Sequence, residues 1–419
     1  MRVCILTLGS RGDVQPYVAL ARGLSKAGYD VALLTDPSFR GFVQAHGVEW
    51  RSFDTGDPRA LIHSPEGRAL VAGMANPVTL VRELSKLLEP MLEKGYTEAR
   101  QNTTDADALL VAPTVLPLAQ TLHQKSGVPF AGAFLQPSHA TRAFASWIFP
   151  DPPAWLPFRG ALCKWSARFG WELLFRVAGR AFDRARERVF GLPPAGNPYR
   201  MLERERWPAL YGFSTAVVPR PADWGPHIEI TGYWFLERDP RWRPSAELEA
   251  FLADGPPPIC VGFGSMPSGD PAALAREVVR ALELAGCRGL LLSGWGALAQ
   301  VELPKSVFAL EAAPHDWLFP RVAAVVHHGG AGTTAAALRA GVPSLVVPFI
   351  ADQRFWGERI ANLGAGPRPF SRKKLRAERF ALALRELVLT PRFSDGAARA
   401  ADALAREDGL ARAAAALPF

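Results

Sequence analysis

One pattern occurs twice along this chain and constrains its fold more than any other feature. It consists of a short apolar run, a glycine-containing turn, a stretch with helical spacing and a second apolar run. In the first copy the apolar run is 2–8, the turn is 9–13, the helical stretch is 14–27, and the second run is 30–35. Such runs are typical of buried parallel strands, and a strand, a helix and a strand in about 30 residues predict a βαβ unit.

The second copy begins with an apolar run at 258–263 and a turn at 264–269. Asp270 then suits a helix N-cap with a proline behind it, and Gly286 ends that helix before a strand at 289–293. Further apolar runs predict strands at 108–112, 129–134, 323–326 and 344–347. Strands that alternate with helices form parallel sheets, so we expect an α/β chain with two Rossmann-like, doubly wound parallel-sheet domains.

The length of 419 residues also fits two domains better than one compact core. We expect an N-terminal domain over 1–216, a linker dense in proline over 217–244, a C-terminal domain over 245–393, and a C-terminal helix over 394–419 that packs back on the N-terminal domain. Residues 140–206 are rich in Trp, Arg and Pro, and we expect them to form helices inserted outside the first sheet.

Composition narrows the class of protein. The four cysteines are scattered and form no C-x-x-C pair, which argues against a structural zinc site or a disulfide framework. No apolar run is long enough to span a bilayer, and the stretch Met1–Leu8 is too short for a signal peptide, so we expect a cytoplasmic protein. The formal charge of +8 comes without a basic tail, zinc-finger or RRM signature, so we expect no nucleic-acid partner.

The strongest motif is His-His-Gly-Gly-Ala-Gly-Thr-Thr at 327–334, between an expected strand and an expected helix. Glycines such as Gly330 and Gly332 let the backbone approach a ligand, and a helix N-terminus presents free N–H groups to an anion. His328 can donate to a phosphate oxygen, and Thr333 can cap the helix or bond a second oxygen. The alternative is a structural turn with a capping threonine, but two adjacent histidines favour a binding site.

Three weaker signals lie after other strands. Asp352 and Gln353 offer adjacent acceptor groups for sugar hydroxyls, although Asp352 alone would suit an N-cap. Asp13, in the first strand-to-helix turn, can act as a general base or serve as an N-cap. The turn at Gly264 and Ser265 can contact phosphates, but a single glycine turn is weak support.

The order of these motifs is more specific than any one of them. His328 and its glycines are followed by Gly-Val-Pro at 341–343, then Pro348, then Asp352 and Gln353. This order resembles the donor-binding signature of family 1 glycosyltransferases, the UDP-glycosyltransferases. Within that family, further segments are similar to the sterol glucosyltransferase and glycopeptide-antibiotic branches: 9–16, 232–235, 314–319 and 352–357.

The resemblance implies a GT-B fold, with the two domains facing across a cleft, and inverting hexose transfer that needs neither a metal ion nor a cofactor. It implies that a nucleotide sugar is the donor, with its diphosphate held by His328 and the glycine-rich turn and its sugar by Asp352 and Gln353. Asp13 stands where many relatives carry a catalytic histidine, so the general-base role falls to it. Plant-type relatives carry a ribose-binding glutamate where this chain has Ala336. This departure leaves the choice between a UDP-sugar and a dTDP-sugar open, with UDP-glucose as the first expectation for the donor.

The same resemblance implies a hydrophobic hydroxyl acceptor such as a sterol, a carotenoid or another lipid. Residues 142–207 place five tryptophans among twelve Arg and Lys side chains, a composition that also suits peripheral contact with a membrane. The alternative for that segment is an ordinary aromatic core beneath a solvated basic face.

Two other functions share parts of this pattern. An NAD-dependent oxidoreductase would use a Rossmann fold and an acidic residue such as Asp36, but the turn at 9–13 lacks the G-x-G-x-x-G spacing. A non-catalytic binding subunit would keep the fold without the chemistry. The presence of Asp13, His328 and Asp352 argues against that second alternative.

Overall fold

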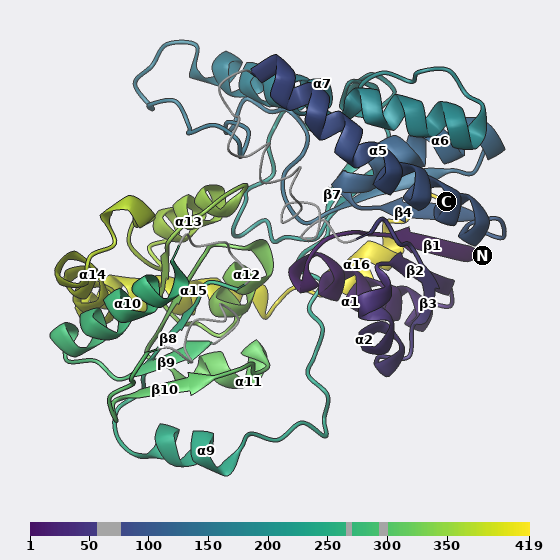
Figure 1. Cartoon of the computed structure of the whole chain (residues 1–419). Coiled ribbons are helices and arrows are strands. Elements are labelled where there is room, and N and C mark those ends of the chain that lie inside the picture. The colour runs from purple at the N-terminus through teal and green to yellow at the C-terminus, as the bar shows by residue number, and fades with distance from the viewer. Residues whose placement is uncertain (57–76, 265–269, 293–300) are drawn as a thin grey trace. The chain divides into compact units, whose positions relative to one another are not determined.

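The structure, a computed structural model, describes residues 1–56, 77–264, 270–292 and 301–419 (Figure 1). The chain divides into two compact units. The first unit comprises Met1–Gly212, Arg220–Leu236 and Asp408–Phe419, and the second comprises Phe213–Pro219 and Glu237–Glu407. Each unit is built on one parallel sheet, which confirms the expected pair of Rossmann-like folds.

The sheet of the first unit has seven strands in the order β3-β2-β1-β4-β5-β6-β7, all parallel. Its strands are β1 Arg2–Leu6, β2 Asp30–Thr35, β3 Glu49–Ser52, β4 Ala108–Val111, β5 Phe130–Phe134, β6 Ala209–Tyr211 and β7 Ile228–Ile230. The central strands are buried along almost their whole length, as unbroken apolar runs require when helices cover both faces.

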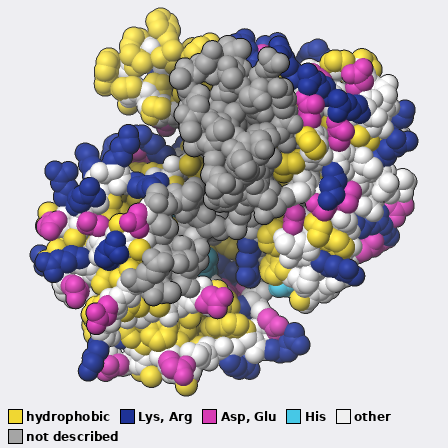
Figure 2. Space-filling view, viewed as in Figure 1, with side chains coloured by type: hydrophobic (Ala, Val, Ile, Leu, Met, Phe, Trp, Pro, Cys, Tyr) yellow, Lys and Arg dark blue, Asp and Glu magenta, His cyan; other side chains and the backbone are white. Residues whose placement is uncertain are grey.

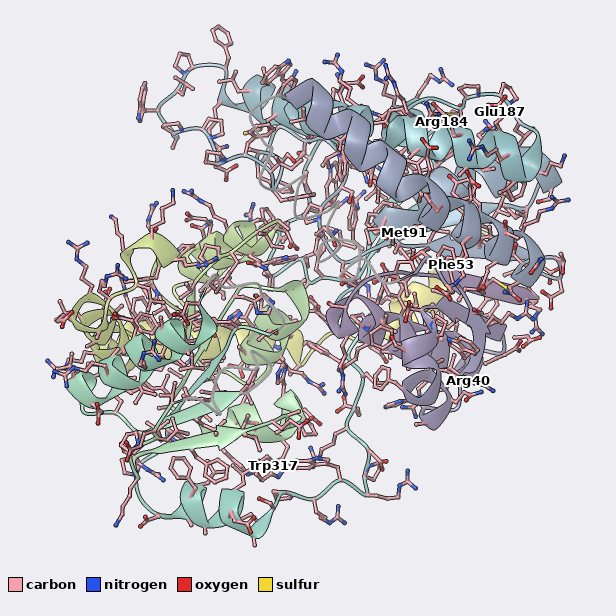
Figure 3. The ribbon with its side chains drawn as sticks, in the orientation of Figure 1. Arg40, Phe53, Met91, Arg184, Glu187 and Trp317 are labelled. Atoms are coloured by element: carbon pink, nitrogen blue, oxygen red, sulfur yellow. The ribbon has the colours of Figure 1, made fainter. Side chains whose placement is uncertain are left out.

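Helices cover this sheet. Their bounds are α1 Arg11–Lys26, α2 Arg40–Ala45, α5 Pro77–Asn102, α6 Leu116–Ser126, α7 Arg159–Phe190, α8 Pro198–Arg204 and α16 Gly409–Ala415, with short 3-10 turns η1 Pro37–Phe39 and η2 Pro113–Val115. The long helix α7 packs along α5, and Arg184 of α7, which is labelled in Figure 3, pairs with Glu89 of α5. Helix α16 packs on α1, so closely that a Cβ at Gly23 would lie 2.9 Å from Leu410 Cβ.

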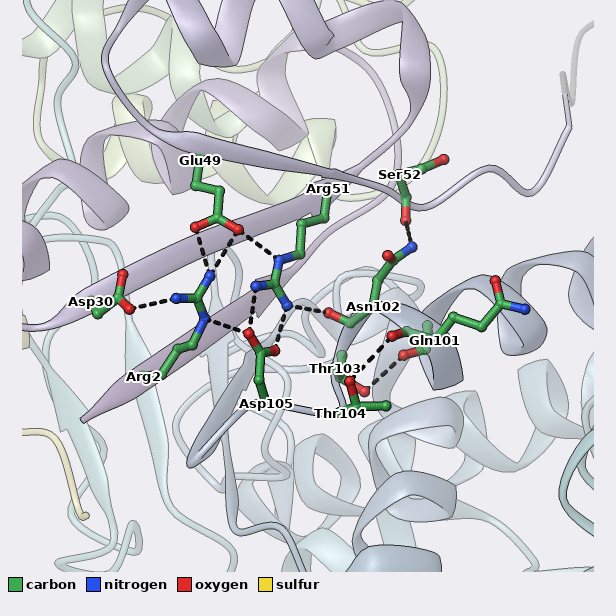
Figure 4. A network of polar contacts seen from close by, with 11 residues as sticks. Arg2, Asp30, Glu49, Arg51, Ser52, Gln101, Asn102, Thr103, Thr104 and Asp105 are labelled. Atoms are coloured by element: carbon green, nitrogen blue, oxygen red, sulfur yellow. Dashed lines mark hydrogen bonds and ion pairs between the residues drawn. The ribbon is translucent and has the colours of Figure 1, made fainter.

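An ion-pair network lies near the amino ends of the strands (Figure 4). The Arg2 guanidinium reaches Asp30 at 2.5 Å and Asp105 at 2.9 Å, and Arg51 reaches Asp105 at 2.5 Å. The guanidinium of Arg51 lowers the pKa of the Asp105 carboxyl to about 2, against a smaller opposing effect of burial. The network ties β1 to its neighbours at the edge opposite the carboxyl ends of the strands.

The sheet of the second unit has five parallel strands in the order β10-β9-β8-β11-β12. They are β8 Ile259–Gly262, β9 Gly289–Leu292, β10 Val307–Leu310, β11 Ala324–His327 and β12 Ser344–Val346. The helices are α9 Ala246–Ala253, α10 Pro271–Ala285, α11 His315–Leu318, α12 Ala331–Arg339, α13 Gln353–Asn362, α14 Ala377–Leu389 and α15 Pro391–Leu404, with 3-10 turns η4 Phe319–Arg321 and η5 Arg372–Lys374.

The core of the second unit has two layers, one on each face of the sheet. Ile259 and Val261 of β8 point to the layer formed with α10 and α14, while Cys260 between them points to the layer that contains Trp317 (Figure 3). This alternation is the period-two pattern of a strand buried on both faces. The Asp270 side chain accepts from the N–H of Ala273, which confirms the expected N-cap of α10.

The structure differs from the expected division of the chain in two places. The segment expected as a linker, 217–244, contains β7, which pairs with β6 at the edge of the first sheet. The stretch expected as one C-terminal helix, 394–419, is two helices, because Asp408 caps a new helix through the N–H of Ala411. Among the described residues no helix is long and apolar enough to cross a membrane.

Candidate functional site

Both sheets reverse their strand order at one point. In the second sheet the chain goes from β8 outward through β9 to β10, and then returns to place β11 on the other side of β8. In the first sheet the corresponding reversal lies between β1 and β4. Open parallel sheets bind ligands beyond the carboxyl ends of the strands at such a reversal. The turn that leads to Asp13 follows β1, and the turn that carries His328 follows β11.

His328 lies beside the turn that follows β8. A Cβ built at Gly264 would lie 3.5 Å from His328 Cε1 and 3.8 Å from its Nδ1. This proximity follows from the register, which pairs His327 with Gly262 across β11 and β8. Burial lowers the pKa of His328 to about 4, against a backbone hydrogen bond with Gly262 that raises it. The imidazole is therefore neutral at pH 7, and its Nδ1 is buried without a hydrogen-bond partner among the described residues.

His327 sets the shape of the glycine-rich turn. Its ring is fully buried, and its Nδ1 accepts the N–H of Gly329 at 3.1 Å. Gly329 has φ +95°, and a Cβ there would lie 2.6 Å from both the Gln353 carbonyl oxygen and Val346 Cγ1. Only glycine fits this close approach. The turn after β11 is thus held directly against the start of α13.

Helix α12 begins without a side-chain cap. Gly330 is the N-cap residue, and Thr333 lies inside the first turn, so of the two alternatives for Thr333 the structure does not support the N-cap. The first N–H groups of a helix have no partner within it. Gly332 is exposed, and a Cβ there would meet no atom within 4 Å. This end of α12 offers uncapped donors beside open space.

Asp352 and Gln353 stand at the start of α13, and neither side chain caps it. The Asp352 carboxylate accepts from Trp356 Nε1 at 2.7 Å rather than from the helix backbone. Gln353 is buried, and its Oε1 accepts the N–H groups of Phe349 and Ile350 at 2.6 and 3.0 Å. Gln353 therefore shapes the turn before the helix. Ala351 in that turn has φ +54°, a strained backbone for a residue other than glycine.

In the first unit, Asp13 is the third residue of α1 and not its N-cap. Its Oδ2 accepts from the Ser10 N–H at 2.8 Å and the Ser10 hydroxyl at 2.9 Å, and the bond from the Ser10 N–H is the Asp13 half of a capping box. Residue 13 is exposed, yet surrounding protein atoms raise the pKa of its carboxyl above the ordinary value, against the lowering effect of both Ser10 hydrogen bonds. The two contacts with Ser10 hold the Asp13 carboxylate at the start of α1.

A cavity of about 470 Å³ opens between α7 and α8 in the first unit. Trp171 and Tyr199 line it with stacked rings, their centroids 3.6 Å apart. Ser138, four residues beyond the end of β5, lines the cavity as well. Three arginines also contribute to its wall: Arg168, Arg200 and Arg204. Its volume falls within the range of small-molecule sites.

The structure therefore brings most of the expected donor residues together in the second unit, around β8, β11 and β12. Ser265 lies outside the described residues, and Asp13 belongs to the first unit. The sequence reading missed the positioning roles of His327 and Gly329, although both lie within the strongest motif. Among the described residues no group of three His, Cys, Asp or Glu side chains is placed to hold a metal ion.

Comparisons with known proteins agree with this geometry. The glycosyltransferase family 28 N-terminal domain matches residues 3–145, and the C-terminal domain of the erythromycin biosynthesis protein CIII-like family matches 297–414. An O-mycaminosyltylonolide 6-deoxyallosyltransferase of Streptomyces fradiae is 36% identical over 99% of this chain and 96% of its own length. The chain belongs to this family of glycosyltransferases. A sterol 3-beta-glucosyltransferase of Arabidopsis thaliana is 35% identical to this chain over 99% of the chain's length.

The relatives differ in length. The glycosyltransferase spans 67% of the Arabidopsis protein and 29% of a sterol 3-beta-glucosyltransferase of Aspergillus clavatus, which is 34% identical. Among solved structures, the calicheamicin glycosyltransferase matches 99% of the chain with a TM-score of 0.70 at 17% identity. The glycotransferase of kitacinnamycin matches with a TM-score of 0.69 at 20% identity. These likenesses confirm the GT-B fold.

Proposed function

We propose that the protein transfers a hexose from a nucleotide diphosphate sugar to a hydroxyl of a hydrophobic acceptor, with inversion at the anomeric carbon. The observation that carries the proposal is the convergence of three turns at one edge of the second sheet. His328, Gly264 and the uncapped start of α12 lie beside one another there, and Gly329 packs against the start of α13.

The donor diphosphate would be held by fixed hydrogen-bond donors. Neutral His328 has one N–H, which a diphosphate oxygen would accept in place of the Gly262 carbonyl, and the start of α12 adds backbone N–H groups, including that of Gly332. Gly330, Thr333 and the Gly264–Ser265 turn complete this proposed set. Such donors stabilise the charge that develops on the departing diphosphate, so the proposed reaction needs no metal ion or cofactor.

The donor sugar would meet Asp352 and Gln353. The Asp352 carboxylate is held by Trp356 Nε1 at 2.7 Å, so its orientation is fixed before the donor arrives. Seven relatives are named sterol glucosyltransferases, and one is named a deoxyallosyltransferase. The glucosyltransferase names support glucose as the first candidate sugar. We propose UDP-glucose as the first candidate donor, with a dTDP-sugar as the alternative.

Asp13 would take the proton of the acceptor hydroxyl as it attacks the anomeric carbon. Its raised pKa makes the carboxylate a stronger base than an ordinary aspartate, and Ser10 fixes its orientation. The carboxylate would keep one oxygen, Oδ1, for the acceptor, because both Ser10 bonds go to Oδ2. No oxidation or reduction is involved.

The acceptor would lie along the carboxyl edge of the first sheet. β5 stands two strand spacings from β1, about 10 Å, so a rigid polycyclic alcohol can reach from Asp13 to the cavity beside Ser138. The names of the relatives support a sterol or a macrolide as the class of acceptor. We propose, in addition, that the protein meets such an acceptor at a membrane surface.

A mass-spectrometric screen of UDP- and dTDP-sugars against sterols, carotenoids and macrolide aglycones tests the proposal. Purified protein should form a product heavier by one glycosyl group with at least one pair, in the presence of a chelator. Hydride transfer to or from a nicotinamide cofactor, with no sugar transfer to any alcohol, would support the oxidoreductase alternative. Tight donor binding with neither transfer nor donor hydrolysis would support a binding subunit.

A further inference from the structure

Exposed apolar side chains are concentrated in one part of the first unit. Twelve large hydrophobic side chains are exposed among the described residues, and seven of them lie between residues 155 and 174. Trp155 is 80% exposed and Trp165 60% exposed. Figure 2 shows hydrophobic side chains gathered at the upper left, over the loop that leads into α7. Scattered exposed apolar residues are ordinary, but a contiguous group marks an interaction surface.

The spacing along α7 makes this group a continuous stripe. Leu162, Trp165, Phe169 and Leu173 recur every three or four residues, so they share one face of the helix over about 16 Å. Trp155 and Phe158 precede them in the loop and at the N-cap. We call these six residues the apolar ridge. The opposite face of α7, which includes Cys163, Ala167 and Trp171, is buried and accounts for the packing of the helix.

Contacts within the ridge hold its rings at the surface. The rings of Trp165 and Phe169 stack at 4.9 Å with an interplanar angle of 11°, and Phe169 also contacts Phe149 at 6.0 Å. Rings held in this way do not need to reorganise before they enter an apolar phase. The ridge is therefore pre-organised for a partner.

Charge identifies the partner. The segment 142–180 carries six basic residues and two acidic ones. Two of the basic residues, Arg176 and Arg180, continue the helical spacing of the ridge, and both are exposed. Trp and Phe beside Arg suit the boundary between acyl chains and headgroups, and a net positive segment complements anionic headgroups. The same helix lines the cavity of the first unit through Arg168 and Trp171.

We propose that the apolar ridge docks the protein on a lipid bilayer that contains anionic headgroups, with α7 lying along the surface. The inference rests on the proposed function for its purpose, since a hydrophobic alcohol would be dissolved in that bilayer. Its physical basis is independent of the reaction, because vesicle binding needs neither donor nor acceptor.

The test is sedimentation with phosphatidylcholine vesicles, with and without phosphatidylglycerol, at low and high salt. The protein should pellet with the mixed vesicles and less with phosphatidylcholine alone, and salt should weaken only the anionic contribution. The double variant Trp155→Ser/Trp165→Gln should lower the partition coefficient at least about tenfold on both vesicles. Arg176→Gln/Arg180→Gln should lower it only on mixed vesicles, roughly fivefold for each arginine.

The matched control is Leu382→Ser/Leu389→Ser on α14, where both side chains are also exposed, 65% and 74%. This control should bind vesicles like the parent protein. Circular dichroism and thermal unfolding should show that all variants remain folded. The ridge variant should glycosylate a water-soluble acceptor at the parent rate, so failure of vesicle binding and failure of transfer can be told apart.

Three results would overturn the inference. The first is no pelleting of the parent protein with either vesicle. The second is equal pelleting of the parent and the ridge variant. The third is a dimer in sedimentation equilibrium that the ridge variant converts to monomer, which would make the ridge an interface between two copies of the chain.

Discussion

Two glycines in the motif at 327–334 should respond in opposite ways to the same added methyl group. At Gly332 a Cβ would meet no atom within 4 Å, so Gly332→Ala creates no clash. Alanine is a better helix residue than glycine by roughly 0.5–1 kcal/mol. The Gly332→Ala protein should therefore be as stable as the parent, or slightly more stable.

At Gly329 the same change should be costly. The residue has φ +95°, and its Cβ would lie 2.6 Å from the Gln353 carbonyl oxygen and from Val346 Cγ1. A left-handed backbone costs a residue with a Cβ roughly 1–2 kcal/mol, and overpacking adds roughly 1–3 kcal/mol. We expect Gly329→Ala to lose about 2–5 kcal/mol of stability and to displace the start of α13.

The affinity for nucleotide distinguishes a phosphate-binding site at residues 327–334 from a purely structural turn. If the diphosphate approaches the backbone at the start of α12, the methyl group of Gly332→Ala should displace it and remove a charge-assisted hydrogen bond. Such a bond contributes about 1.5–3 kcal/mol, so the Kd for UDP or dTDP should rise at least about tenfold. Calorimetry measures this Kd, and thermal unfolding measures the stability of the variant. Unchanged nucleotide affinity in folded Gly332→Ala would refute this placement of the phosphates.

Three further variants test other parts of the structure. His328→Ala should weaken UDP binding by about 1.5–3 kcal/mol for each lost hydrogen bond, and calorimetry with no change, together with unchanged turnover, would remove His328 from the donor site. Gln353→Ala should leave the N–H groups of Phe349 and Ile350 without their acceptor, which should cost about 1–3 kcal/mol of stability and raise the KM for the donor. Urea unfolding measures the stability, and steady-state kinetics measure the KM. An unaltered KM would contradict the role of this turn. Asp105→Asn should cost about 1 kcal/mol at pH 7, because its ion pairs are half exposed. The pKa of Asp105 is lowered to about 2, so its contribution is present above the ordinary aspartate pKa and disappears as the pH falls toward 2. The free energies of unfolding of the parent and Asp105→Asn proteins, measured in urea, should therefore converge as the pH falls through that range. A difference that stays constant with pH would contradict the assignment.

The parallel strands and the turns after them could be predicted from sequence because they are local. The run at 30–35 is apolar from 31 to 34 and matches β2 at both ends, and the run expected at 289–293 begins where β9 begins. Strands β6 and β7 could not be predicted in the same way. Each has only three residues, and the segment around β7 is dense in proline, so local composition resembled a linker.

The site was predictable as a set of motifs but not as a geometry. The composition of residues 327–334 predicts an anion site. The contact of Gly329 with Gln353, in contrast, depends on the pairing of β11 with β12, which composition does not reveal. Capping was predicted correctly at Asp270, where a proline follows, whereas the capping alternative for Thr333 does not agree with the structure. At Asp13 the decisive partner, Ser10, is three residues earlier in the chain and was visible only as part of a turn.

The central claim is that the second unit binds the donor while Asp13 of the first unit activates the acceptor. The most direct measurement is single-turnover transfer by Asp13→Asn, with donor affinity measured on the same preparation. The account predicts a loss of roughly 10²–10⁴ in the rate of transfer, with nucleotide affinity unchanged. It also predicts that the acid limb of the parent pH–rate profile, set by a raised pKa of Asp13, is absent from the variant. Transfer at the parent rate by Asp13→Asn would contradict the account and leave Asp13 only its structural role with Ser10.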